Sequence, residues 1–470
     1  MNERVVNRLR EIVGPESLLT SPEELLCHSS DATRKSALPE AVVRPESVEQ
    51  VAAIARLCSE ESVPLTPRGA GTSLSGGAIP ANSGVCLSFA RMNRIREIVT
   101  EDLYVVVEAG VVTEELHNKV EAASLFYPPD PTSRRNSTIG GNINTSATGL
   151  RSVKYGVTRN YLMGLEIVLP SGEVMKTGAR TVKSVAGYDL TRLICGSEGT
   201  LAIVTSATLK LIPLPEHRVT VLGAFTTLEG AAEASRNVMS SGVAPSILEI
   251  MDSLTVEAVS SDVALLSGAF PSGAFPSGAQ GCSLLLAETD GFREAAENEA
   301  DRIEKVCIDC GATLVEKSAE QGYTQRLWEG RRSVLNALTK LKPVIVLENA
   351  TVPRSRIVEM IRSIVEIGKR YHLLIATFGH AGQGNLHFAV LLDAPVSDKA
   401  ASVEAAVSEI SGKALSLDGI LSGERGIGIE KAGFLTIEIG ESASEIMTRL
   451  KDAFDPRGIL NPGKRFWTKP

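Results

Sequence analysis

Two of the six histidines of the chain, His380 and His387, flank the glycine-rich stretch AGQGNL within FGHAGQGNLHF, residues 378–388. The surrounding sequence LLIATFGHAGQGNLHFAVLLD predicts a β-hairpin with this stretch at its tip. Two imidazoles that face each other on a hairpin can share one divalent ion at about 2.0 to 2.1 Å, with a carboxylate as the usual third ligand. A histidine is also often a hydrogen-bonded polar group without a metal. The pair alone therefore leaves both interpretations open.

Three long glycine-rich loops precede this hairpin. PRGAGTSLSGG at 67–77 follows a strand-like run, and its glycines allow backbone N–H groups to approach an anion. Its spacing is GxGxxxxG and no helix follows, which excludes a Rossmann fingerprint, and a simple glycine turn remains the alternative. PPDPTSRRNSTIGGNINTSATG at 128–149 and GYDLTRLICGSEGTLAIVT at 187–205 are similar. Most connections have only about 4 to 6 residues, so three such loops favour a domain that wraps a large polar ligand.

The elements that must position these residues fall into two parts. Residues 1–216, with a core at about 38–215, alternate short strands with loops and helices, which predicts an α+β domain. Residues 217–470 begin with the order βαββαβ of ferredoxin-like sheets, followed by a partial second copy. This predicts one broad antiparallel sheet backed by helices on one face. The near-repeat SGAFPSGAFPSGAQ at 267–280 predicts a surface loop.

Composition limits the class of partner. The formal charge of −8 over 470 residues and the pI of about 5.5 argue against nucleic acid and anionic lipid, which need clustered positive charge. No apolar run reaches the ~18 residues of a transmembrane helix, and MNERVVNRLREIVG lacks the features of a signal peptide. Seven scattered cysteines suit reduced thiols. We expect a cytoplasmic protein without a transmembrane segment.

Several ordered motifs resemble a known family. PRGAGTSLSGG, PPDPTS with TIGGNI, YG at 155–156, GYDL and GSEGTL resemble the FAD-binding domain of flavoproteins of the vanillyl-alcohol-oxidase type. GHAGQGNLH, SGERGIG and DPRGILNPGKRF are similar to the group that contains the glycolate oxidase flavoprotein subunit, D-lactate dehydrogenase and D-2-hydroxyglutarate dehydrogenase. The resemblance extends from about residue 20 to 467. It implies a two-domain α+β flavoprotein with an FAD-binding domain, a ferredoxin-like antiparallel-sheet cap domain and a C-terminal segment that returns to the flavin.

The resemblance also implies where FAD binds, with the pyrophosphate on loop 68–77 and the isoalloxazine ring at the domain interface. The residues at matching positions are Arg68, Gly69, Gly71, Thr72, Ser73, Gly76, Pro131, Ser133, Thr138, Gly141, Asn142, Asn144, Glu198, Ile203 and Asn461. Some relatives attach FAD covalently through a histidine in or beside the first loop. No histidine lies between His28 and His117, so we expect non-covalent FAD.

The family pattern HxGDGNxH, followed by EHG, implies that His380, His387 and Glu424 bind a divalent metal ion such as zinc, iron or manganese. This sequence departs from the pattern twice, with Gln383 in place of the aspartate and Arg425 in place of a histidine that acts as base. Arginine cannot act as a base because its guanidinium stays protonated. It can hold a substrate carboxylate in bidentate fashion, in which case deprotonation depends on the metal. The alternative is that dehydrogenase activity is weakened or lost.

A second arginine, Arg331 in LWEGRRSV, matches the family position that grips the substrate carboxylate, although a lone arginine in a helix is more often a surface residue. Glu348 in PVIVLENATVP is an additional acid predicted near the same sheet.

These implications predict FAD-dependent oxidation of a small D-2-hydroxy acid, such as lactate or glycolate, to the 2-oxo acid. The chain has no cysteine cluster for an iron–sulfur centre, so the electrons would pass to an iron–sulfur subunit, an electron-transferring flavoprotein or a quinone. The protein would then be cytoplasmic or held at the inner face of the membrane through a partner. The alternative is a non-catalytic flavoprotein subunit that relays electrons. Gln383 and Arg425 favour this alternative, and the intact set His380, His387 and Glu424 disfavours it.

Overall fold

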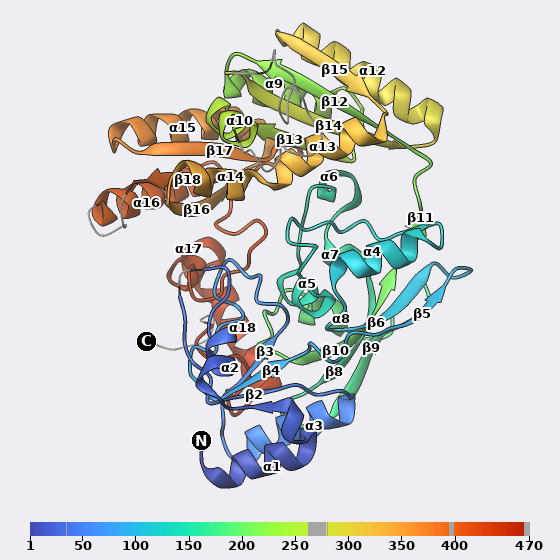
Figure 1. The fold of residues 1–470 in the computed structure, drawn as a ribbon, viewed down its shortest axis with the longest axis vertical. Coiled ribbons are helices and arrows are strands. Elements are labelled where there is room, and N and C mark those ends of the chain that lie inside the picture. Colours follow the sequence, from blue (N-terminus) through green and yellow to red (C-terminus); the bar gives the residue numbers. More distant parts are fainter. Residues whose placement is uncertain (34, 262–278, 280, 394–398, 465–470) are drawn as a thin grey trace. The chain divides into compact units, whose positions relative to one another are not determined.

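The computed structural model describes residues 1–33, 35–261, 279, 281–393 and 399–464 (Figure 1). The surface loop predicted at 267–280 lies, apart from Ala279, outside these residues.

The chain forms two compact units, and neither is a single stretch of sequence. The first unit consists of residues 1–149, 156–214 and 424–470, and the second of residues 150–155 and 215–423. The predicted boundary at 216 lies two residues from the junction between Leu214 and Pro215. The short segment Leu150–Tyr155 belongs to the second unit although its neighbours on both sides belong to the first.

A small four-stranded sheet with the order β1-β2-β4-β3 opens the first unit. Strand β4 is parallel to both of its neighbours, and β1 is antiparallel to β2. Helix α3 begins after Ser47, whose hydroxyl accepts a hydrogen bond from the Gln50 N–H. The elements of this part are α1 (Glu3–Val13), β1 (Leu18–Leu19), α2 (Pro22–Cys27), β2 (Ala41–Val43), α3 (Val48–Glu60), β3 (Leu65–Arg68) and β4 (Val85–Ser88).

A second, five-stranded antiparallel sheet follows, with the order β5-β6-β10-β8-β9. The glycine-rich loops at 128–149 and 187–205 lie among its strands and short helices, whereas the loop at 67–77 lies between β3 and β4 of the four-stranded sheet. The elements of this part are β5 (Ile95–Val99), β6 (Tyr104–Glu108), α4 (Thr113–Glu121), β7 (Leu125–Phe126), α5 (Ile139–Thr145), α7 (Thr158–Tyr161), β8 (Leu162–Val168), β9 (Val174–Gly178), α8 (Leu190–Ile194), β10 (Ile203–Lys210) and β11 (Ile212–Pro213).

The C-terminal segment completes the first unit. It contains α17 (Leu435–Ile439) and α18 (Glu441–Phe454), after which Leu460 forms a parallel bridge with Leu65 of β3. The Asn461 N–H then donates to the Leu65 carbonyl at 2.9 Å. The segment around Asn461 is thereby joined to the strand that leads into the first glycine-rich loop.

The second unit contains a seven-stranded antiparallel sheet with the order β15-β12-β14-β13-β17-β18-β16. All of its pairings are antiparallel, as predicted. The elements are α6 (Ser152–Tyr155), β12 (His217–Phe225), α9 (Leu228–Ser240), β13 (Ile247–Met251), α10 (Ser253–Ser260), β14 (Ser283–Gly291), α12 (Arg293–Asp309), β15 (Leu314–Ser318), α13 (Gln321–Arg332), α14 (Val334–Leu341), β16 (Val344–Thr351), α15 (Ile357–Arg370), β17 (Leu374–His380), β18 (Asn385–Leu392) and α16 (Ala400–Ser416).

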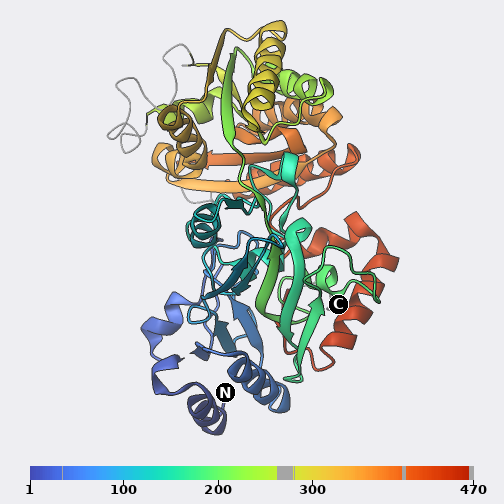
Figure 2. The same cartoon turned by 90° about the vertical axis from the view of Figure 1, so that its right-hand side faces the viewer.

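The prediction that helices cover one face of this sheet is wrong, because helices cover both faces (Figure 2). Helices α9, α12, α15 and α16 pack on one face, where Val221 of β12 contributes to the core. Helices α10, α13 and α14 pack on the other face, where the next residue, Leu222, contributes. Successive strand residues point to opposite faces, and both are buried here.

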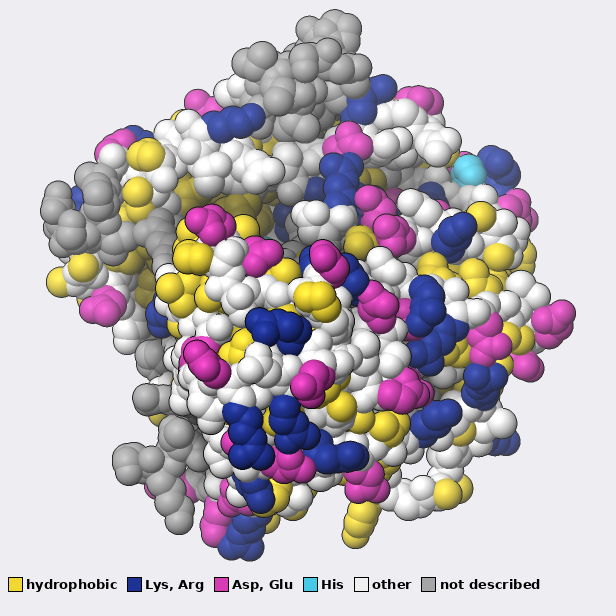
Figure 3. All heavy atoms as spheres, turned by 60° about the horizontal axis from the view of Figure 1, so that its bottom comes forward, with side chains coloured by type: hydrophobic (Ala, Val, Ile, Leu, Met, Phe, Trp, Pro, Cys, Tyr) yellow, Lys and Arg dark blue, Asp and Glu magenta, His cyan; other side chains and the backbone are white. Residues whose placement is uncertain are grey.

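The surface carries charges of both signs. On the face in Figure 3, lysine and arginine side chains are interspersed with aspartate and glutamate. Exposed charges also pair with each other: Arg91 and Glu46 form an ion pair at 2.5 Å. Within the described residues, no helix is long and apolar enough to cross a bilayer.

Candidate metal and cofactor site

The hairpin predicted around His380 and His387 is present. Strands β17 and β18 pair antiparallel, with His380 opposite Asn385 and Phe378 opposite His387. The tip turns through Gly384, which has φ +75°, and a Cβ there would lie 1.9 Å from the Val352 carbonyl oxygen. Only glycine fits this close approach in a left-handed conformation, which explains the glycine at the tip.

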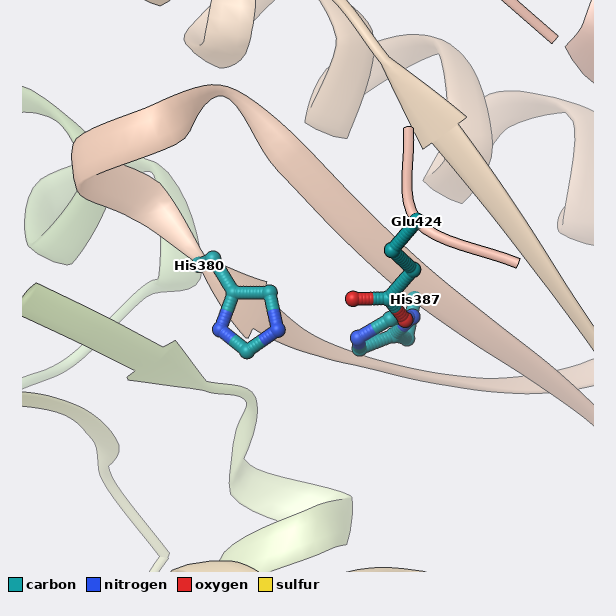
Figure 4. A group of neighbouring side chains, drawn as sticks. All are labelled: His380, His387 and Glu424. Carbon is teal, nitrogen blue, oxygen red and sulfur yellow. The ribbon is translucent and has the colours of Figure 1, made fainter. Parts of the chain in front are cut away.

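His380, His387 and Glu424 lie together (Figure 4). Each offers one ligand atom, and these three atoms are all within 4.8 Å of one another. Both histidines are buried, and their rings are 5.2 Å apart between centroids in an edge-to-face arrangement. Two imidazoles and a carboxylate are a common ligand set for catalytic zinc and for non-haem iron, with coordination positions left open. The donor set therefore fits a divalent metal ion.

Glu424 directly follows Gly423, the last residue of the second unit. The last residues of that unit are held near the end of strand β16, which pairs with β18 of the hairpin, because the Ile420 N–H donates to the Thr351 carbonyl at 2.9 Å. Gly423 packs so closely that a Cβ would lie 2.3 Å from Thr351 Oγ1. These contacts bring the chain to the position from which the carboxylate of Glu424 reaches the histidines.

The segment that follows Glu424 is fixed by Glu198 in the first unit. The two carboxylate oxygens of Glu198 accept hydrogen bonds from the N–H groups of Ile427, at 2.7 Å, and Gly428, at 2.8 Å. Burial raises the pKa of Glu198, and these two N–H groups oppose the rise. Glu198, predicted to contact FAD, therefore also holds the segment that begins with Glu424.

Gly428 offers a test of this segment. It has φ +52°, and a Cβ would lie 2.0 Å from the Ser75 carbonyl oxygen. We expect Gly428→Ala to lower the free energy of unfolding by about 2 to 3 kcal/mol, measured by urea denaturation. Gly433→Ala is the matched control, because a Cβ on Gly433 would have no atom of the described residues within 4 Å. Equal stability of the two variants would contradict the tight packing of this segment.

Arg425 is buried beside Glu424. Its Nε lies 3.8 Å from Glu424 Oε1, and its carbonyl accepts a hydrogen bond from Ser75 Oγ at 2.8 Å. Thr148 Oγ1 donates to Glu424 Oε2 at 3.2 Å. The hydrogen bond from Ser75 thus fixes the backbone of Arg425. The guanidinium of Arg425 places positive charge next to the carboxylate of Glu424.

The first two glycine-rich loops meet within the first unit. A Cβ on Gly69 would lie 2.3 Å from Thr138 Oγ1, and a Cβ on Gly76 would lie 2.4 Å from Ile429 Cγ1. Arg68 donates to the carbonyls of Ser30, at 2.7 Å, and Ala78, at 3.1 Å. A Cβ on Gly71 would lie 2.3 Å from Nη2 of that arginine, so Arg68 holds the backbone of the first loop.

Most of the other residues predicted to contact FAD lie on the three glycine-rich loops or their flanks, and Asn461 lies in the C-terminal segment that bonds to them. Ser73 Oγ accepts the N–H groups of Ser75, at 3.2 Å, and Gly77, at 3.1 Å. Asn461 Nδ2 donates to the carbonyl of Glu198 at 2.7 Å and to that of Gly77 at 3.1 Å. Two residues have clear roles within the fold itself: Asn142 Nδ2 donates to Thr113 Oγ1 at 2.8 Å, and Ile203 belongs to a hydrophobic core. The remaining positions are Thr72 in the first loop, Pro131 and Ser133 in the second, and Gly141 and Asn144 in helix α5.

The polar atoms of these loops indicate whether a large polar cofactor fits. Four buried oxygens have no hydrogen-bond partner among the described residues: Thr138 Oγ1, Asn144 Oδ1, Ser197 Oγ and Asn461 Oδ1. Buried polar atoms are almost always satisfied, so these four oxygens, which lie on the second loop, the third loop and the C-terminal segment, indicate a polar ligand. Together with the glycines of the first loop, they fit the nucleotide part of FAD.

A functional-site residue that the sequence did not reveal is Glu249 of β13, which is fully buried. Its carboxylate contacts His380 Nδ1 at 2.5 Å and Arg331 Nη2 at 2.6 Å. The structure thus places Arg331, the predicted substrate residue, in a buried ion pair on helix α13. A glutamate within the apolar run SILEIM is the only sequence signal that could have singled it out.

The family matches give the class of the protein, and the fold and the site agree with it. Residues 39–178 match the family described as FAD binding domain, and residues 214–465 match FAD linked oxidases, C-terminal domain. The chain therefore belongs to the FAD-linked oxidases. The predicted resemblance to this group and the predicted α+β fold class are confirmed.

Relatives named for particular activities cover almost the whole chain. The chain is 43% identical to glycolate oxidase subunit GlcD of Bacillus subtilis (strain 168), over 98% of this chain and 96% of the relative. It is 33% identical to D-lactate dehydrogenase of Anaerostipes hadrus, over 98% and 96%. Among solved structures, 4-ethylphenol oxidase from Gulosibacter chungangensis has a TM-score of 0.78 at 18% identity, over 99% of this chain and 97% of that one. For p-cresol methylhydroxylase the TM-score is 0.79 at 16% identity, over 99% and 96%. At this low identity, the similarity to these two structures supports the fold of the chain and not its activity.

Proposed function

We propose that the protein oxidises a small D-2-hydroxy acid, such as lactate or glycolate, to the 2-oxo acid and passes the electrons from FAD to a partner. The observation that carries the proposal is the cluster of His380, His387 and Glu424 in a member of the FAD-linked oxidases. Relatives named glycolate oxidase subunit and D-lactate dehydrogenase support the same substrate class.

The chemistry of a hydroxy acid suits this set of residues. FAD supplies the acceptor for the hydride that leaves the substrate α-carbon. The hydroxyl proton must leave as well, so the developing charge on the hydroxyl oxygen needs stabilisation. His380, His387 and Glu424 would hold a zinc, iron or manganese ion, which supplies Lewis-acid stabilisation of that oxygen.

The arginines of the site would bind the other end of the substrate. Arg425 cannot accept a proton, and its buried guanidinium suits a substrate carboxylate. Glu249 engages Nε and Nη2 of Arg331, so a carboxylate bound by Arg331 would contact Nη1. We assign Arg425 the main role in holding the carboxylate and Arg331 a supporting one.

FAD would be bound without a covalent link. His28 and His117 are the histidines nearest in sequence to the first glycine-rich loop. His117 Nε2 lies 2.9 Å from the Pro129 carbonyl oxygen and donates to it, which suits a structural role. The unpaired loop oxygens, Asn461 among them, would instead hold the cofactor by hydrogen bonds.

An iron–sulfur subunit, an electron-transferring flavoprotein or a quinone would accept the electrons. The first of these is supported by the name of the relative from Bacillus subtilis, which designates a subunit.

The second candidate function is a non-catalytic electron-relay subunit. It is favoured by Arg425, because no histidine base stands beside Glu424.

An anaerobic titration tests the proposal. The purified protein, analysed for metal, receives D-lactate, L-lactate, glycolate and D-2-hydroxyglutarate in turn while the visible flavin band is recorded. We expect D-lactate or glycolate to bleach the band and L-lactate to leave it unchanged. Removal of the metal with a chelator should abolish bleaching, and added Mn²⁺ or Zn²⁺ should restore it. A bound flavin that none of the four acids reduces would favour the relay subunit.

A further inference from the structure

Glu249 joins three elements of the second unit. It lies on β13, and its Oε1 is 2.5 Å from His380 Nδ1 at the end of β17. Its Oε2 is 2.9 Å from Nε and 2.6 Å from Nη2 of Arg331 on α13. All three side chains are buried, with exposed fractions of 0% for Glu249, 2% for His380 and 4% for Arg331. Both carboxylate oxygens are therefore used inside the protein.

The charge on Glu249 is supported by its neighbours. Arg331 Nη2 lies 2.6 Å from Oε2 of Glu249, and a guanidinium at this distance favours the ionised form of the carboxyl group. Arg331 remains protonated, so it can balance the carboxylate when the imidazole is neutral. Glu249 is consequently an acceptor for hydrogen bonds and cannot donate one.

This contact determines which nitrogen of His380 can bind a metal. An ionised carboxylate accepts a hydrogen bond from Nδ1, so in the neutral imidazole the proton is on Nδ1 and the lone pair is on Nε2. A histidine that binds a metal through one nitrogen commonly donates the other N–H to a carboxylate, which fixes the tautomer and the ring orientation.

The second histidine is tied to the same group through Phe378. The guanidinium carbon of Arg331 lies 5.1 Å from the centroid of the Phe378 ring. On the neighbouring strand, the ring of His387 lies 5.3 Å from that of Phe378, and the two residues are opposite each other in the hairpin. Arg331 therefore contacts Glu249 directly and supports the ring that packs against His387.

We propose that Glu249 is a positioning residue of the metal site, which fixes His380 with Nε2 available for the ion, and that Arg331 keeps Glu249 in place. The inference rests on the proposed function in one respect, namely that the cluster of His380, His387 and Glu424 binds a divalent ion. It gives Arg331 a role that does not depend on the substrate. A residue that only binds the substrate carboxylate would change KM for the acid and leave the affinity for the metal unchanged.

The test compares Glu249→Gln with Glu288→Gln. Glu288 is also a buried glutamate of the same sheet, and it pairs with Arg151 at 3.6 Å instead of contacting a histidine. The FAD-loaded, metal-free proteins are titrated with Zn²⁺ by calorimetry and with Mn²⁺ by EPR of the free ion. Glutamine keeps the shape but loses the charge, so we expect about 10- to 100-fold weaker metal binding in Glu249→Gln. Glu288→Gln should bind as tightly as the wild type.

Further variants separate positioning from folding. Glu249→Asp keeps a carboxylate, although a shorter one, and its affinity should lie between those of the wild type and Glu249→Gln. Should Glu249→Gln fail to fold because Arg331 loses its partner, the double variant Glu249→Gln/Arg331→Met removes both charges and should show the same weakened metal binding. Unchanged affinity in a folded Glu249→Gln or double variant would overturn the inference. Wild-type protein that binds neither ion would instead contradict the proposed metal site itself.

Discussion

His387→Ala should lower kcat for the hydroxy acid about 1,000-fold, because loss of the metal removes about 4 kcal/mol of stabilisation from the developing charge on the substrate oxygen. The imidazole of His387 is buried and belongs to the group of three ligand atoms within 4.8 Å. No other residue of that group can replace it. Steady-state kinetics with an artificial electron acceptor and metal analysis of the same sample measure the two effects together.

Bound flavin shows whether the His387→Ala protein is still folded and still binds FAD. The loops proposed to bind FAD lie in the first unit and His387 in the second, so the visible flavin band should persist after the substitution. His372→Asn serves as the control, since His372 is exposed and has φ +53°, a conformation that asparagine tolerates. The control should turn over as the wild type does. Normal turnover in metal-free His387→Ala would contradict the role of the metal.

Arg425→Lys should reduce kcat/KM by about 100-fold or more, mainly through a higher KM, because lysine keeps the charge but loses the planar fork that holds a carboxylate. The backbone at Arg425 is anchored by Ser75, so the change acts through the side chain. Arg449→Lys is the control, as Arg449 is an exposed residue that pairs with Glu445 at 2.5 Å. Kinetics over a range of hydroxy-acid concentrations separate kcat from KM.

The variant Arg425→His distinguishes the two candidate functions. Under the proposed function it loses the carboxylate contact, so its kcat/KM should fall as in Arg425→Lys. A higher turnover than the wild type would mean that the natural sequence lacks a needed base, and it would support the relay subunit. The comparison is informative because Arg425 is the residue at which this chain departs most clearly from the family pattern.

Features with local signals are predictable from the sequence. The hairpin around His380 follows from two strand-forming runs with a glycine-rich tip, and Gly384 occupies the position where only glycine fits. The FAD-binding fold follows from ordered motifs over the whole chain, and the family matches confirm it. The hairpin pattern and each single motif lie within a short stretch, so no knowledge of distant contacts is needed to see them.

Features that depend on distant contacts are not predictable in this way. The sequence singles out Glu348 as an acid near this sheet, whereas Glu249 is the acid that contacts His380, 131 positions away in the chain. The contact of Glu198 with Ile427 spans 229 positions. Neither partner is indicated by its neighbours in sequence, because such pairs are created by strand order and loop packing.

The error about the helices has a physical reason that the sequence itself contains. Strand β12, HRVTVLGAF, is buried at seven consecutive positions after its first two residues. A strand with one face in solvent alternates apolar and polar residues, whereas a continuous apolar run indicates burial on both faces. The run VTVLGAF therefore indicates that helices cover both sides of the sheet.

The small segment Leu150–Tyr155 constrains how this protein can be divided or recombined. Lys154 and Tyr155 both bond to the buried Asp290, at 2.6 and 2.9 Å, and Arg151 pairs with Glu288. A gene fragment that starts at residue 215 would encode Asp290 and Glu288 but not the partners of these two acids. Leaving a buried charge without its partner costs about 3 to 5 kcal/mol. The second unit therefore cannot be exchanged between relatives as residues 215–423 alone, because residues 150–155, from within the stretch that matches the FAD binding domain, would have to be exchanged with it.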